Sequence, residues 1–357
     1  MSQFFSAAPA ADDSMKHKID IKSLTLAELT AQMAADGVPA FRAKQVFRWL
    51  HQKKVTSFAE MSDLSLPLRE KYNQKYYIAS INVQKRLVSA LDGTVKYLYG
   101  LADGNTVEAV LMQYRHGTSL CISTQVGCRM GCTFCASTIG GLVRHLTAGE
   151  MLEEVYAAQR DSGQTIGSLV LMGIGEPLDN YDNVLRFLRL LSAPEGHGLS
   201  LRHVSLSTCG LVEQIDRLAE EKLGLTLSVS LHAPNDALRS QTMPVNRRYP
   251  IATLLAACRR YFARTGRRIS FEYALIDGVN DSDACAKELA QQLRGLSCHI
   301  NLIPVNTVEG KSYRAAKATR VERFSALLAE TGLTVTVRRK LGADINAACG
   351  QLRRSSS

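Results

Sequence analysis

The stretch SLCISTQVGCRMGCTFC, residues 119–135, decides the fold because it joins a strand pattern directly to a cysteine-rich loop. Residues 119–124 form an apolar run typical of a buried strand, and Cys128, Cys132 and Cys135 follow at the spacing C-x3-C-x2-C. In barrels of alternating strands and helices, active sites gather at the carboxyl ends of the strands. The position of this loop therefore predicts such a barrel, with its chemistry at one end.

Strand and helix patterns alternate from this point almost to the C-terminus. The expected strands cover residues 119–124, 168–172, 203–207, 226–231, 269–275 and 299–304, with a last strand at 334–339. The expected helices cover residues 147–162, 181–191, 211–222, 251–264, 282–294 and 318–331. Repeated βα units imply a parallel sheet with right-handed crossovers. The predicted fold class is α/β, a partial (β/α)6 barrel with a small N-terminal helical domain and a β-hairpin extension.

The segments before the barrel have different patterns. A capping box that begins at Thr25 predicts a helix, whereas Asp92-Gly93 and Asp103-Gly104 separate alternating runs, as hairpin turns do. The expected division is a flexible tail at 1–20, a helical accessory domain at 21–77, the β-hairpin extension at 78–117, the barrel at 118–340, and a C-terminal loop and tail at 341–357.

Composition and charge exclude several classes of protein. Of the 357 residues, 46% are hydrophobic and 21% are charged, which excludes a mainly disordered or fibrous chain. The 43 lysines and arginines exceed the 33 acidic residues, and this excess favours a polyanionic partner such as nucleic acid. No run approaches the roughly 18 apolar residues of a membrane helix, and the N-terminus lacks the apolar core of a secretory signal. We therefore expect a cytoplasmic protein.

The cysteines point to a metal cluster. Nine cysteines, an odd number, argue against a framework of structural disulfides. Three thiolates on one short loop can hold three irons of a [4Fe–4S] cluster, whereas the usual electron-transfer cluster takes four cysteines. One iron is then open to a small chelating ligand. The alternative is a zinc site with a distant fourth ligand, or a set of buried cysteines, but zinc sites favour paired C-x2-C units.

Polar and glycine-rich segments follow one expected strand after another. Glycine lets a backbone approach a ligand closely, and a carboxylate accepts hydrogen bonds from an amino group. Taken singly, each segment has an ordinary explanation, such as a helix cap or a buried histidine. Together they predict one pocket with contacts to a ribose, an adenine and an amino-acid group, formed by Gly175, Glu176, Ser207, Ser230, Leu231, His232 and Asn306.

Six segments, two single residues and the cysteine loop carry a resemblance to one known family. They are GIGEPL (173–178), SLSTCG (205–210), SVSLHAP (228–234), MPVN (243–246), NLIPVN (301–306) and ADINAACGQL (343–352), with Glu108 and Cys121. The chain resembles the bacterial rRNA adenine-C2 methyltransferases of the RlmN/Cfr type, which are radical S-adenosylmethionine (SAM) enzymes. The resemblance runs from about residue 21 to residue 352.

This resemblance implies a cofactor set and a division of roles. Cys128, Cys132 and Cys135 would bind one [4Fe–4S] cluster. SAM, two molecules per turnover, would bind to the pocket residues named above. Cys349 would be the methylated cysteine, Cys121 its resolving partner and Glu108 the proton acceptor.

The chemistry of the target explains these roles. Carbon 2 of adenine is electron-poor and cannot attack the methyl group of SAM directly. In the family, one SAM methylates the Cys349 thiolate by displacement. A 5′-deoxyadenosyl radical from the second SAM takes hydrogen from the S-methyl group, and the carbon radical adds to the ring. Glu108 then removes the ring proton, and Cys121 attacks the Cys349 sulfur, which frees the product and leaves a transient disulfide.

The resemblance also implies the partners. They are 23S rRNA, tRNA at the adenosine next to the anticodon, and an electron donor such as flavodoxin, with the protein acting as a monomer away from membranes. Clustered basic residues are expected to form the RNA surface collectively through phosphate contacts. The clusters are Arg247-Arg248, Arg259-Arg260, Arg264, Arg267-Arg268, Arg338-Arg339-Lys340 and Arg353-Arg354.

Two other functions fit part of the pattern. Methylation of adenine carbon 8, the Cfr-type antibiotic-resistance activity, shares almost every residue named, although GEPL and LIPVN are more similar to the C2 enzymes. A non-catalytic RNA-binding protein with a structural zinc is the alternative from a different class. It leaves Glu108, Cys121 and Cys349 without a role.

Overall fold

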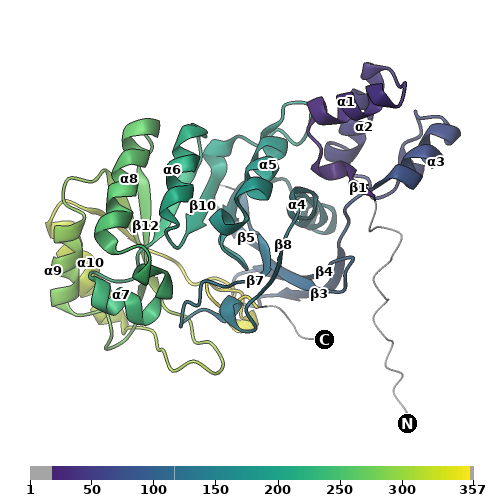
Figure 1. The fold of residues 1–357 in the computed structure, drawn as a ribbon. Coiled ribbons are helices and arrows are strands. Elements are labelled where there is room, and N and C mark those ends of the chain that lie inside the picture. Colours follow the sequence, from purple (N-terminus) through teal and green to yellow (C-terminus); the bar gives the residue numbers. More distant parts are fainter. Residues whose placement is uncertain (1–17, 116, 354–357) are drawn as a thin grey trace, which may run out of the picture.

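One ten-stranded sheet runs through the molecule in the computed structural model, which describes residues 18–115 and 117–353 (Figure 1). Its order is β14-β13-β12-β11-β10-β9-β6-β5-β4-β3, and neighbouring strands from β6 to β14 are parallel. The parallel strands are β6 (Gly117–Cys121), β9 (Ile166–Leu171), β10 (Val204–Thr208), β11 (Thr226–Ser230), β12 (Ile269–Leu275), β13 (Cys298–Pro304) and β14 (Thr334–Val337). The predicted α/β class and partial barrel are confirmed.

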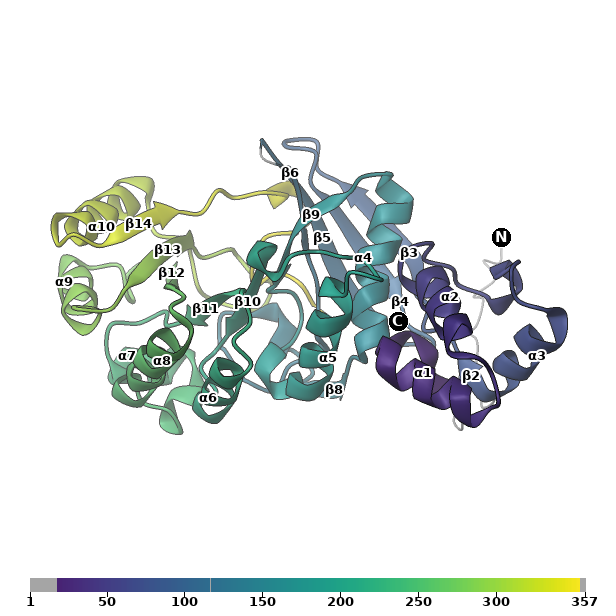
Figure 2. The same cartoon turned by 90° about the horizontal axis from the view of Figure 1, so that it is seen from above.

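A helix follows each barrel strand before the last and covers the outer side of the sheet (Figure 2). These helices are α4 (Ala148–Ser162), α5 (Tyr181–Ser192), α6 (Val212–Glu220), α8 (Ile251–Thr265), α9 (Asp283–Gln292) and α10 (Ala318–Glu330). Each agrees with an expected helix to within about two residues at either end. The capping box of α4 forms as its sequence predicts, with the Thr147 side chain accepting from the backbone of Glu150.

The extension before the barrel is part of the same sheet. Its strands are β3 (Asn82–Val88), β4 (Val95–Gly100) and β5 (Thr106–Tyr114), all antiparallel, with left-handed turn glycines at Gly93 and Gly104. β5 pairs with β6, where Val110 lies opposite Cys121. The β-hairpin extension expected from the sequence is thus three antiparallel strands that continue the barrel sheet.

The 3-10 turn Ile21–Ser23, just before the N-terminal helices, joins α4 through a buried ion pair. These helices are α1 (Leu26–Ala35), α2 (Ala40–His51) and α3 (Leu66–Lys75). Lys22 Nζ donates to Glu153 Oε1 at 2.5 Å and to the carbonyl of Ala79 at 2.9 Å, and both charged side chains are fully buried. The other oxygen of Glu153 accepts from exposed Arg160. The expected tail at 1–20 lies, up to residue 17, outside the described residues.

Several short elements have no counterpart among the expected ones. β7 (Gln125–Gly127) and β8 (Leu142–His145) pair antiparallel on either side of the cysteine loop, and α7 (Asp236–Thr242) is followed by a 3-10 turn at Pro244–Arg247. β1 (Ile19–Asp20) and β2 (Tyr76–Tyr77) form a two-stranded parallel ribbon. Two to seven residues give too few repeats for a periodic pattern, so the sequence does not predict these elements. In the part of the chain that the structure describes, no helix is long and apolar enough to cross a membrane.

We expect Lys22→Met to lower the free energy of unfolding by about 3–5 kcal/mol, because it leaves the Glu153 carboxylate buried with one exposed partner. Urea unfolding followed by circular dichroism measures the change. The double variant K22M/E153M removes both buried charges, and it should recover much of the loss. A double variant as unstable as the sum of both single variants would contradict this account.

Candidate active site

The β7–β8 ribbon holds the cysteine loop at its base. The Cys128 amide donates to the carbonyl of Gly141 at 3.1 Å, so the loop is closed by a backbone bond. Gly127 has a left-handed φ of 77°, and a Cβ there would lie 1.9 Å from the Gly141 oxygen. Only glycine fits at this close approach, and it allows Cys128 to begin the loop directly after the strand.

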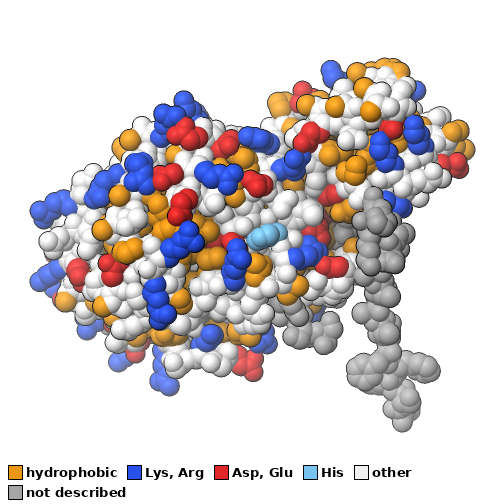
Figure 3. Space-filling model, in the orientation of Figure 1, with side chains coloured by type: hydrophobic (Ala, Val, Ile, Leu, Met, Phe, Trp, Pro, Cys, Tyr) orange, Lys and Arg blue, Asp and Glu red, His pale blue; other side chains and the backbone are white. Residues whose placement is uncertain are grey.

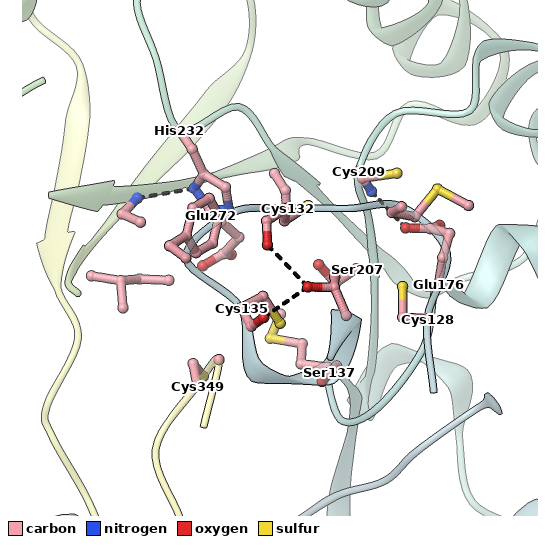
Figure 4. A pocket seen from close by; sticks show the side chains of 18 of the residues that line it. Cys128, Cys132, Cys135, Ser137, Glu176, Ser207, Cys209, His232, Glu272 and Cys349 are labelled. Atoms are coloured by element: carbon pink, nitrogen blue, oxygen red, sulfur yellow. Dashed lines mark hydrogen bonds between the residues drawn. The ribbon is translucent and has the colours of Figure 1, made fainter. Parts of the chain in front are cut away.

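Hydrogen bonds from neighbouring residues satisfy the backbone of the cysteine loop. Thr138 Oγ1 donates to the carbonyls of Cys132 and Cys135, at 3.3 and 2.9 Å. The Thr133 amide donates to the carbonyl of Thr242, the last residue of α7, at 2.9 Å. With their backbone engaged in this way, the three thiols line one cavity (Figure 4).

The cavity lies at the carboxyl ends of the barrel strands and encloses about 160 Å³. Its lining includes the cluster cysteines and most of the residues predicted for the pocket. Those that line it are Cys128, Cys132, Cys135, Gly175, Glu176, Ser207, Ser230, His232, Asn306 and Cys349. Cys209, which follows Ser207 closely in the sequence, lines it as well.

Gly175 and Glu176 form a tight turn after β9. Gly175 has a φ of 111°, and a Cβ there would lie 2.7 Å from the side chain of Gln125. Glu176 is buried, and its carboxylate accepts from the amides of Leu178 and Cys209, at 3.1 and 2.8 Å. Burial raises the pKa of this carboxyl group, and these hydrogen bonds oppose the shift. The turn thus fixes a carboxylate against the cavity wall.

His232 is a rigid, neutral group in the wall. Its φ is 56°, its Nδ1 accepts from the Ala274 amide at 2.9 Å, and its ring meets Phe134 edge to face. Burial, followed by the charge of Arg239, lowers its pKa to about 3. Because Nδ1 is an acceptor, the neutral ring carries its proton on Nε2.

Three predicted site residues do not line this cavity. Leu231 is fully buried in the core, and its backbone is held by the carbonyl of Glu272 and by Arg239. Cys121 is buried in a small apolar cluster with Val110, and its pKa is raised to about 12, first by burial and then by the charge of Cys349.

The third, Glu108, lines a neighbouring cavity of about 270 Å³ with Lys85 and Lys96. Its carboxylate pairs with Lys96 Nζ at 2.8 Å and accepts from the amide of Arg353 at 2.9 Å. Burial raises the pKa of Glu108, and Lys96 opposes that shift. The C-terminal segment separates this carboxylate from the cluster cysteines.

Cys349 is held at the cavity by hydrogen bonds to its segment. Asn306 Nδ2 donates to the carbonyl of Cys349 at 3.0 Å, and the Ala136 amide donates to that of Gly350 at 2.8 Å. All nine cysteines lie in the described parts of the chain, and all are free thiols. No disulfide joins Cys121 to Cys349 in this structure.

The same C-terminal segment bridges the two edges of the open sheet. It leaves β14 at one edge and reaches the β3–β4 turn at the other. The Asp344 carboxylate accepts from Ser89 Oγ at 2.7 Å and from the Ala90 amide at 2.9 Å. The Gly342 amide donates to Asp92 at 2.9 Å, and Lys96 Nζ donates to the carbonyl of residue 346 at 3.1 Å.

Two charged residues of the cavity were missed. Glu272 is buried on β12 and accepts from Asn301 Nδ2 at 2.7 Å, and burial raises its pKa. The sequence signal that could have identified Glu272 is a charged residue inside an otherwise apolar strand pattern. Arg338 lies between Glu272 and Cys349, and the Cys349 charge is the first cause that raises its pKa. It was read as part of a basic surface cluster.

The three cluster cysteines fit an iron–sulfur cluster. Burial raises the pKa of all three thiols, that of Cys128 to about 12, so they need a metal to become thiolates at neutral pH. Across the described residues, no three His, Cys, Asp or Glu side chains converge on a single-ion position. A [4Fe–4S] cluster binds its cysteines through separate irons and needs no such convergence.

The basic clusters are distributed unevenly around this site. Arg248, Arg260 and Arg264 pair with acidic side chains of α6, and Figure 3 shows basic and acidic groups side by side on that face. Arg267 and Arg268 precede β12, so they lie at the end of the barrel opposite the cavity. The collective basic surface expected from the sequence therefore does not form as one patch. Arg354 lies outside the described residues.

The exposed Arg339 and Lys340 differ, because they lie at the mouth of the site. They line a small cavity of about 50 Å³ together with Cys349 and Tyr114. Exposed Arg353 and Lys85 line the cavity of Glu108. These four cations surround the openings of the two cavities.

Comparisons with known proteins agree with this geometry. The radical SAM superfamily model matches residues 122–288, and the model of the ribosomal RNA large subunit methyltransferase N-terminal domain matches residues 19–78. A probable dual-specificity RNA methyltransferase RlmN from Lachnoclostridium phytofermentans is 52% identical over 342 residues, which are 96% of each chain. This chain belongs to the RlmN family.

Other members support the assignment to the RlmN family. A probable dual-specificity RNA methyltransferase RlmN from Alkaliphilus oremlandii is 52% identical over 94% of this chain and 98% of its own. The crystal structure of a radical SAM methyltransferase from Sphaerobacter thermophilus has a TM-score of 0.89 and 47% identity, and it covers 94% of this chain and 99% of its own. The predicted family and radical SAM fold are confirmed, and with them the [4Fe–4S] cluster and SAM as cofactors.

We expect Cys132→Ala to lose the cluster, because two thiolates remain where three irons must be held. Iron and sulfide analysis after anaerobic reconstitution measures this, and SAM cleavage should be lost with the cluster. Cys285→Ala, a buried cysteine outside the cavity, is the matched control and should keep both. A full complement of iron and sulfide in C132A would contradict the ligand assignment.

Proposed function

We propose that this protein methylates carbon 2 of adenosine in 23S rRNA, and of the adenosine next to the anticodon in tRNA, through a methyl-cysteine on Cys349. The observation that carries the proposal is that Cys349 shares one cavity with Cys128, Cys132 and Cys135. The RlmN names of relatives about half identical over nearly the whole chain support the RNA substrates and the position on the base.

The cavity residues bind and orient SAM in this proposal. They are Gly175, Glu176, Ser207, Ser230, His232 and Asn306, with Leu231 taking part through its backbone. Glu176 offers an anionic acceptor for an amino group, and His232 offers a fixed Nε2–H donor. When bound, the cluster and SAM supply the electron, the methyl group and the hydrogen-abstracting radical. Cys128, Cys132 and Cys135 hold the cluster.

Cys349 carries the methyl group between SAM and the RNA base. Its thiolate attacks the methyl carbon of SAM: an S–C bond forms, the bond from that carbon to the SAM sulfur breaks, and S-adenosylhomocysteine leaves. Arg338 lines the same cavity as Cys349 and places a positive charge there. Burial holds Cys121 as a neutral thiol meanwhile, so it does not compete for the methyl group.

Glu108 accepts the ring proton of the adenine. Its raised pKa suits a general base, because proton transfer to it is more favourable than to an ordinary carboxylate. The Arg353 amide, which now donates to this carboxylate, must move away when the base arrives. The target base must also leave its stack to reach the site.

Cys121 completes the reaction. Its sulfur attacks the Cys349 sulfur and an S–S bond forms. The bond from the Cys349 sulfur to the methylene carbon on the base breaks, and the proton of the Cys121 thiol passes to that carbon, which becomes the methyl group of the product. This disulfide is transient, and reduction returns the pair to the thiol form that the structure holds. We further propose a flavodoxin-type electron donor, action as a monomer and a cytoplasmic location.

The decisive experiment is mass spectrometry of adenosines from an unmethylated 23S rRNA fragment, incubated anaerobically with the reconstituted protein, SAM and a reductant. The expected product is 2-methyladenosine. 8-Methyladenosine would keep the mechanism and overturn the choice of carbon 2. If no methylated base forms despite an intact cluster and SAM cleavage, the assignment of 23S rRNA as substrate is wrong.

We expect Cys349→Ala to keep its cluster and to lose RNA methylation entirely, because no other thiol in the cavity carries the methyl group. The assay is incorporation of label from [methyl-³H]SAM into RNA. Turnover without Cys349 would contradict the methyl-cysteine scheme.

Cys121→Ala tests the resolving role of Cys121. We expect it to accumulate RNA linked covalently to Cys349, seen as a shifted band in denaturing gels. Free, unmodified RNA alone in that variant would contradict the resolving role.

We expect charge reversal at the cavity mouth, R339E/K340E, to weaken RNA binding at least tenfold and to reduce its salt dependence by about two phosphate contacts. Filter binding at several salt concentrations measures both. The control R267E/R268E makes the same charge change at the far end of the barrel and should bind RNA as the wild type does. Equal losses in both variants would contradict the placement of RNA at this mouth.

A further inference from the structure

Arg239 on α7 is a fully buried arginine whose hydrogen bonds all go to neutral oxygens. Nε donates to the carbonyl of Leu231 at 3.1 Å, and Nη2 donates to those of Cys209 and Ser230, at 2.7 and 3.1 Å. Nη1 donates to Asn246 Oδ1 at 2.9 Å and to a further carbonyl, that of residue 249, at 3.3 Å. A guanidinium has five N–H donors, and all five are used here.

This geometry leaves a cation in the interior without a carboxylate at its N–H groups. Carbonyl dipoles solvate a buried charge but do not cancel it, and an isolated buried charge is costly. Such a group is stable when a nearby negative charge compensates it. Burial lowers the pKa of Arg239, and the charges of Cys209 and Cys132 are the first to oppose that shift.

The structure places Arg239 directly behind the cluster site. Its acceptors Cys209 and Ser230 line the cavity of the cluster cysteines. Three residues further along α7, about 4.5 Å of helix, the carbonyl of Thr242 accepts from the amide of Thr133, which follows Cys132. The helix that carries the guanidinium is therefore bonded to the loop that carries the ligands.

We propose that Arg239 is the buried counter-charge of the iron–sulfur cluster and raises its reduction potential. This inference rests on the proposed function, in that a cluster occupies the cysteine loop. A cluster held by three thiolates is anionic, and reduction adds one more negative charge. Net charge and buried charges nearby set the potentials of such clusters. A fixed cation therefore favours the reduced form.

Arg239 also acts as a positioning residue for SAM. Its planar guanidinium, with its fork of N–H groups, bonds the carbonyls of Cys209 and Ser230. It thereby links the ends of β10 and β11, where the cavity wall begins. The two effects are separable, because the charge acts on the cluster and the hydrogen bonds act on the wall. Lysine keeps the charge and loses the fork. An acidic residue at Asn246 keeps the fork and cancels the charge.

The test is a dithionite titration of the reconstituted, full-length protein, with the reduced cluster followed by electron paramagnetic resonance. We expect Arg239→Gln and Asn246→Asp each to shift the one-electron equilibrium at least tenfold toward the oxidised cluster, which is 59 mV. Asp236→Asn removes a negative charge that Arg239 faces, so it should shift the equilibrium the other way. Arg264→Gln, an exposed site on α8, is the matched control and should change nothing.

Binding of SAM to the same samples separates charge from hydrogen bonding. Arg239→Lys should keep the wild-type potential and bind SAM at least threefold more weakly, whereas Asn246→Asp should bind SAM as the wild type does. Unchanged potentials in both Arg239→Gln and Asn246→Asp, with full clusters, would overturn the proposal. If neither holds a cluster, an unchanged or lowered potential in Asp236→Asn overturns it. A wild-type protein without a cluster would instead contradict the proposed function.

Discussion

The backbone of the cysteine loop has to be satisfied from outside so that its sulfurs are free to face inward. Unpaired backbone groups in a buried loop are costly, and a loop of this kind has no regular secondary structure of its own. The structure meets the requirement with neighbours: the β7–β8 ribbon closes the base, Thr138 bonds the inner carbonyls, and α7 bonds the amide of Thr133. The site depends on these three supports, because they fix the loop whose thiols form one wall of the cavity.

Most of the fold and much of the site could be predicted because they have strong, local signals. Parallel strands are buried runs bounded by turn residues, and a shared carboxyl edge brings residues as distant as Glu176 and Asn306 into one cavity. Short elements such as α7 have too few residues for periodicity to show. The interior position of Arg239 could not be predicted, because the sequence gives no sign that an arginine is buried and tertiary packing alone places it there. Arg338 is half-buried at the cavity, although its neighbours Arg339 and Lys340 are exposed.

The proposed chemistry is divided between two compartments on either side of the C-terminal segment. The cluster cysteines lie in one cavity and the Glu108 carboxylate lies in the other, beside Lys96. A proton acceptor kept apart from the cysteines does not protonate or deprotonate them while the methyl group is being loaded. In the proposed mechanism, the adenine meets both compartments only when the RNA is in place.

The bridge between the sheet edges has a mechanical consequence. A fully closed ring of strands admits only what passes through its open end, and parting two paired strands breaks a whole ladder of backbone bonds. Here the edge strands β14 and β3 are not paired with each other. The gap between them is bridged by the hydrogen bonds of Asp344, Gly342 and Lys96 described above. Breaking these hydrogen bonds leaves the pairing of both edge strands with their own neighbours intact. A macromolecule can therefore enter from the side of the barrel, between β14 and β3, when the segment that carries Cys349 moves away from the β3–β4 turn.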